Sequence, residues 1–217
     1  MFCPVHCVAC EIDAASLLCD SCSEQILSQV CIKCKNFLED GFCRRCASEM
    51  NMTGFRVLAP YSVIKPWIYS HKLNLNHKPE LMDARRFHAI FDTIERSINK
   101  PFSVEIVPSE NCNSWIENIL PNFMYKRIGS STLKRIEDQL AQKYLNREER
   151  SRRRRGLFKV RQDISIRTDA IVLIDDVMST GATLECCISL LLGLGYKEVY
   201  VVVFAYQDRL YKEKYGH

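Results

Sequence analysis

Two neighbouring acids precede a run of small residues in the stretch 171–184, which reads IVLIDDVMSTGATL. Four apolar residues lead into Asp175 and Asp176, and residues 179–183 are all small. Small residues let backbone N–H groups converge on an anion, and hydroxyl groups add further donors. Two carboxylates would repel a phosphate unless they faced the hydroxyls of a ribose or a Mg²⁺ ion carried by the ligand. The pattern predicts a sugar-phosphate site; a surface acidic pair before a capped helix is the alternative.

Cysteines form a second pattern that could do chemistry, because nine of the 12 lie at or before residue 46 and eight of these form CxxC pairs every 12 residues. Two CxxC pairs can enclose one tetrahedral zinc ion, so four pairs predict two closed, structural zinc sites. Disulfides are the alternative, which an expected reducing cytoplasm disfavours. Spacing leaves open whether the pairs share zinc sequentially or in a cross-braced order. The eight ligands are Cys7, Cys10, Cys19, Cys22, Cys31, Cys34, Cys43 and Cys46.

A basic run, NREERSRRRRG, lies at residues 146–156 and includes Arg152, Arg153, Arg154 and Arg155. Four successive arginines cannot all face one core, so most must be solvated or pair with anions. Three roles remain open: a solvated loop, contact with nucleic-acid phosphates, or closure over the diphosphate of a bound ligand.

The apolar patterns predict the elements that would position these residues. Strands are expected at 55–62, 102–108, 170–175 and 198–206, and helices at 78–98, 130–145 and 182–195. Strands alternating with helices indicate an α/β fold with a mainly parallel sheet covered on both faces. Ligands bind beyond the carboxyl ends of such strands, where Asp175 and Asp176 would form the exposed end of their strand.

Length and composition fit one domain of ordinary size with a small appendage. The chain has 217 residues, of which 47% are hydrophobic, and a formal net charge of +4. We expect a cysteine-rich domain at 1–52 and the α/β domain at 53–217. No apolar run approaches the roughly 20 residues that span a bilayer, and the first residues lack the features of a signal peptide. A cytoplasmic protein without membrane contact is expected.

The stretch 171–184 closely resembles the phosphoribosyl-diphosphate (PRPP) motif of type I phosphoribosyltransferases. Together with the four CxxC pairs, the whole chain resembles the ComF (competence protein F) family of bacteria, which joins a double zinc ribbon to such a domain. After the middle strand, however, this chain has VPSENCNSWIENILPNF in place of the family's Arg-Gly-Phe-Asn type segment.

The resemblance implies roles for individual residues. Asp175 and Asp176 would hold the ribose hydroxyls of Mg²⁺-bound PRPP. Lys72, or alternatively Lys78, would meet the diphosphate. The loop residues around the 5′-phosphate would be Ser179, Thr180, Gly181, Ala182 and Thr183.

Three functions follow as hypotheses. The first is binding of PRPP or a nucleotide 5′-phosphate in a protein of DNA uptake or recombination, as the family's role in transformation implies. The second is active phosphoribosyl transfer in nucleotide metabolism. The third is a non-catalytic adaptor that holds single-stranded DNA or a partner such as a DNA translocase or helicase.

Overall fold

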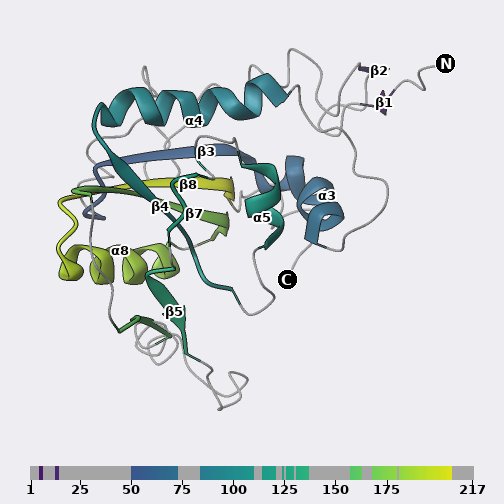
Figure 1. Ribbon diagram of the computed structural model, residues 1–217. Helices are drawn as coiled ribbons and strands as arrows, with labels where there is room; N and C mark the ends of the chain where they lie inside the picture. The colour runs from purple at the N-terminus through teal and green to yellow at the C-terminus, as the bar shows by residue number, and fades with distance from the viewer. Residues whose placement is uncertain are drawn as a thin grey trace, which may run out of the picture.

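A parallel sheet of four strands forms the centre of the structure (Figure 1). The computed structural model describes residues 5–6, 13–14, 50–72, 84–109, 114–120, 124, 126–129, 131–136, 157–162, 168–179 and 181–206. The strands are β3 (Gly54–Pro60), β4 (Phe102–Ile106), β7 (Ala170–Met178) and β8 (Glu198–Tyr206), in the order β3-β8-β7-β4. All three pairings are parallel, which confirms the predicted α/β fold.

The sheet is covered on both faces, as predicted. Helices α3 (Tyr61–Lys72), α4 (Ala84–Ile98) and α5 (Ser114–Ile119) contribute to a core with Val172 and Ile174 of β7. Helix α8 (Ala182–Leu194) contributes to a second core with Ile171 and Leu173. Figure 1 shows α4 and α8 on opposite sides of the strands. Because side chains of a strand alternate between faces, β7 is apolar on both sides and is almost fully buried.

A two-stranded antiparallel hairpin joins the face that α8 covers. Its strands are β5 (Leu133–Arg135) and β6 (Phe158–Val160). Leu133 and Phe158 are buried in the core with α8. The helix expected at 130–145 is therefore wrong at its start, because residues 133–135 form a strand; residues 137–145 lie outside the described residues.

Helix α3 corrects a second expectation. The first strand is expected to end at residue 62, whereas it ends at Pro60 and the helix begins at Tyr61 and ends at Lys72. Proline in a helix interior removes one backbone hydrogen bond, so Pro66 argues locally against this helix. Ile64 and Ile68, four residues apart, are buried at 2% and 1% exposure, and this packing offsets the local cost.

The cysteine-rich segment is described only at β1 (Val5–His6) and β2 (Asp13–Ala14), which pair antiparallel. In the sequence these strands flank Cys7 and Cys10. All eight predicted zinc ligands lie outside the described residues, so the double zinc ribbon and the domain division remain predictions. None of the helices in the described part of the chain is long and apolar enough to cross a membrane.

The central position of β7 yields a first prediction. Leu173→Ala should lower the free energy of unfolding by about 2–5 kcal/mol, because it leaves a cavity at a fully buried site. Urea denaturation followed by circular dichroism measures the change. Ile136→Ala, at a position 38% exposed, serves as the control and should change stability by less than about 0.5 kcal/mol. Equal losses in the two variants would contradict the assignment of Leu173 to the core.

Candidate ligand site at the carboxyl end of β7

Strand β7 extends past its neighbour β4, and this overhang carries the acidic pair. The register pairs Ile106 with Ile174, and the Val107 N–H then donates to the Ile174 carbonyl at 2.8 Å. Beyond this point β7 pairs with β8 as far as Met178 and Tyr206. The acids were expected as the exposed end of the strand. Instead the strand continues through them, and Asp175 is only 7% exposed.

Asp175 and Asp176 face opposite sides of the sheet. Asp175 follows the alternation of Ile171 and Leu173, which pack with α8. Asp176 lies on the other face, where its Oδ2 forms an ion pair with the Lys72 ammonium at the end of α3. Two adjacent carboxylates therefore have different surroundings, one against α8 and one beside a lysine.

Burial determines the protonation of Asp175. Removal from water raises the pKa of this carboxyl to about 8, and the negative charge of Asp176 adds to the rise. Its Oδ1 accepts a hydrogen bond from the Asp176 N–H at 2.9 Å. Asp175 is accordingly mostly protonated at neutral pH and can donate a hydrogen bond.

Asp176 is more accessible and carries the charge of the pair. Its side chain is 17% exposed, and that of Lys72 is 40% exposed. The Val177 N–H donates to Asp176 Oδ1 at 2.6 Å, which fixes the carboxylate against its own strand. Of the predicted residues, the structure thus brings Lys72 and Asp176 into direct contact.

The turn after β7 leads directly into the N-terminus of α8. Ser179 is exposed, Ala182 and Thr183 are half-buried, and Thr180 lies outside the described residues. Gly181 precedes the helix in a left-handed conformation, with φ at 80°, and its missing side chain leaves the first helical N–H groups without a cap from that position. A helix N-terminus of this kind carries partial positive charge and donors suited to an anion.

The remaining predicted positions fall into two groups. Lys78 and Arg152 to Arg155 lie outside the described residues. Cys186 and Cys187 of α8 are 7% and 0% exposed, and burial raises the pKa of the Cys187 thiol.

Comparison with known proteins supports the assignment of this region. Residues 130–217 match the family model of the phosphoribosyl transferase domain. The chain contains a phosphoribosyl transferase domain. The match includes the acidic pair and the small-residue turn, whereas Lys72 precedes it. No curated protein matches the chain.

Strand β4, which precedes the matched residues 130–217, contains a buried acid that the sequence did not single out. Glu105 of β4 is 3% exposed and accepts hydrogen bonds from the Ser131 hydroxyl at 3.0 Å and from the N–H groups of Thr132 and Leu133 at 2.9 and 3.0 Å. Burial raises its pKa, while these donors oppose the rise. In the sequence, the only feature that marks Glu105 as a buried acid is its position within the otherwise apolar strand FSVEIV. Through these hydrogen bonds Glu105 links the start of the β5–β6 hairpin to strand β4 of the sheet.

Within the described residues, no group of three or more His, Cys, Asp or Glu side chains could hold a metal ion. The acids of the transferase domain face opposite ways and so do not form a chelating pair.

The turn provides a second prediction. Gly181→Ala should destabilise the domain by about 1–2 kcal/mol, because a side chain disfavours the left-handed conformation. The added Cβ would also lie 3.0 Å from Met50 Cε and 3.1 Å from Met178 Cε. Gly193→Ala in the same region of the fold is the matched control: it lies inside α8 with open space around it and should stabilise by up to about 1 kcal/mol. Thermal unfolding of both variants measures the difference, and changes of the same sign would contradict the backbone assignment.

Buried Asp175 provides a third prediction, on pH. Its pKa is 3.8 in an unfolded chain and about 8 in the fold, so the folded chain binds more protons between these values. The contribution to stability is therefore complete below about pH 4 and is lost as the pH rises through about 8. Asp175→Asn should flatten the fall in unfolding free energy over this interval, measured by urea denaturation at several pH values. The control Asp92→Asn changes an exposed residue of α4 and should keep the wild-type slope; an unchanged slope in Asp175→Asn would contradict the assignment.

Proposed function

We propose that this chain binds PRPP, or the 5′-phosphate end of a nucleotide, with Mg²⁺ at the carboxyl end of β7. The observation that carries the proposal is the contact between Lys72 and Asp176 within a chain whose small-residue turn leads into the N-terminus of α8. An anion-binding helix end, a cation and a ribose-binding carboxylate are the groups that a sugar phosphate requires. The match to the phosphoribosyl transferase domain supports the same ligand class.

The residues divide the ligand between them. Asp176 would accept hydrogen bonds from the ribose hydroxyls, and residues 179–183 would surround the 5′-phosphate. Lys72 is partly exposed and would exchange its contact with Asp176 for one with the diphosphate. Asp175 would hold its proton and donate toward its neighbours, which limits the negative charge near the phosphates.

Mg²⁺ would supply neutralisation of the diphosphate charge. The protein's own contribution would then be to orient the ribose and hold the diphosphate, which are the main requirements of a reaction at the anomeric carbon. Phosphoribosyl transfer is the second candidate function, and the placement of Lys72 where it can stabilise a leaving diphosphate favours it. The altered segment after β4 favours binding without transfer.

We infer a role in handling DNA, in uptake during transformation or in recombination, from the resemblance to the ComF family. The basic run at 146–156 connects the two hairpin strands, and Lys134, Lys159 and Arg161 add exposed cations to the hairpin. Such a set would contact the phosphates of single-stranded DNA without sequence preference. A DNA translocase or helicase would be the protein partner, and the two zinc ribbons would serve as the docking module.

The acid of the ion pair gives the fourth prediction. Asp176→Asn should weaken Mg²⁺-dependent PRPP binding at least about tenfold, because a charged acceptor for the ribose is lost. Isothermal titration calorimetry measures the affinity. Asp169→Asn is the matched control, since Asp169 forms an exposed ion pair with Lys197 at 2.9 Å and follows no ligand loop. Equal affinities in the two variants would refute the assignment of Asp176 to the ligand site.

A further inference from the structure

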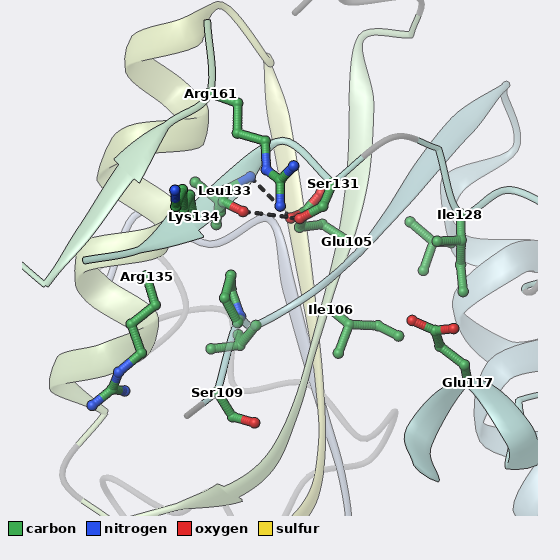
Figure 2. A pocket seen from close by; sticks show the side chains of 13 residues that line it. Glu105, Ile106, Ser109, Glu117, Ile128, Ser131, Leu133, Lys134, Arg135 and Arg161 are labelled. Carbon is green, nitrogen blue, oxygen red and sulfur yellow. Dashed lines mark hydrogen bonds between the residues drawn. The ribbon is translucent and has the colours of Figure 1, made fainter. Parts of the chain in front are cut away.

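A cavity of about 400 Å³ lies beside β4 and the base of the hairpin (Figure 2). Its lining includes residues 104–109 at the carboxyl end of β4, Ser131 and residues 133–135 of the hairpin, and Arg161 after β6. The volume is within the range of small-molecule sites, roughly 300–1,000 Å³. Val107 of this lining donates to Ile174, the residue before Asp175, so the cavity adjoins the proposed PRPP site along the same sheet edge.

The two ends of the cavity carry opposite charges. Arg161 reaches with its guanidinium toward Ser131 at one end, and the Glu117 carboxylate of α5 points toward Ile106 at the other (Figure 2). Between them the lining is mainly aliphatic, with Ile106, Ile128 and Leu133. A cavity with aliphatic walls, a cationic group at one end and an acidic group at the other suits a small molecule that has an acid at one end and a hydrogen-bond donor at the other.

The Arg161 end of the cavity carries more positive charge than ion pairs of the described residues neutralise. Lys134 and Lys159 are directly opposite each other in the hairpin register, and both are exposed. Like charges at opposed positions destabilise a hairpin unless an anion offsets them. Among the ion pairs of the described residues, none involves Lys134, Lys159 or Arg161.

Glu105, the acid beneath this end, offsets at most one of the positive charges of Lys134, Arg135 and Arg161, which line the cavity with it. Its carboxylate is buried, and its oxygens are occupied by Ser131 and by the backbone of Thr132 and Leu133. The same contacts hold Ser131 and the start of β5 beside Arg161, so the anion-binding end has a fixed frame.

We propose that this cavity is a second ligand site, which binds a small molecule with an acidic group at the Arg161 end and an N–H donor at the Glu117 end. The acid, a carboxylate or a phosphate, would pair with Arg161. The ring would pack against Ile106, Ile128 and Leu133. The site does not depend on PRPP binding at β7, and the two can be measured separately on one sample.

The test uses the full chain with ¹³C-labelled methyl groups and 4-aminobenzoate as the probe. Titration should shift the methyl resonances of Ile106 and Ile128, while the buried Ile188 of α8 stays unchanged. Phenyl phosphate and benzoate, compared on the same protein, distinguish a phosphate-bearing from a carboxylate-bearing ligand. Arg161→Gln should weaken 4-aminobenzoate binding about tenfold through loss of a charge-assisted contact.

Two further variants keep the outcome decisive. Arg96→Gln removes an exposed arginine of α4 and should bind the probe like wild type. Glu117→Gln should remove the advantage of 4-aminobenzoate over benzoate and leave benzoate binding intact. The proposal is overturned if 4-aminobenzoate leaves Ile106 and Ile128 unshifted, or if Arg161→Gln binds it as tightly as Arg96→Gln does. Loss of PRPP binding in Asp176→Asn with retained 4-aminobenzoate binding would separate this site from the one at β7.

Discussion

Alternation of side chains along β7 is the constraint on which the site depends. Consecutive residues of a strand face opposite sides of the sheet, so two neighbouring acids cannot share one environment while the strand remains regular. Because β7 continues beside β8 after β4 has ended, Asp175 is enclosed by the fold, whereas Asp176 meets Lys72. One acid is thereby buried, which raises its pKa, and the other remains partly exposed. The same overhang delivers the chain into the turn at Gly181 and the N-terminus of α8.

A second constraint comes from Glu105, which links segments far apart in the sequence. Its contacts to Ser131, Thr132 and Leu133 hold the start of β5, and Leu133 in turn packs in the core under α8. In the sequence, the basic run at 146–156 lies between the two strands of this hairpin. The carboxyl end of β4 thus forms a wall of the cavity and holds the strand that precedes the arginine-rich segment. It is also hydrogen-bonded to Ile174, the residue before the acidic pair.

Sequence patterns predict the elements whose signals are local. The apolar runs of β4, β7 and β8, the helix after the small-residue turn and the burial of Cys187 all follow from periodicity and composition. Helix α3 could not be predicted in this way, because Pro66 opposes it locally and only the packing of Ile64 and Ile68 supports it. The hairpin depends on Glu105, which is 26 to 28 positions from its hydrogen-bond donors. Asp175 is buried where β7 continues beside β8 after β4 has ended. The residues next to Asp175 in the sequence do not indicate where these neighbouring strands end.

The most direct test of the proposed ligand site is calorimetric titration of the wild-type chain with PRPP, with and without Mg²⁺, followed by a diphosphate-release assay on the same sample. The structure predicts saturable, one-to-one binding that Mg²⁺ strengthens, because Lys72 alone cannot neutralise the diphosphate. Release of diphosphate would add transfer to binding. Absence of any binding heat on titration with PRPP in the presence of Mg²⁺ would contradict the account. The turn after β7 would then be a feature of the fold that does not bind this ligand.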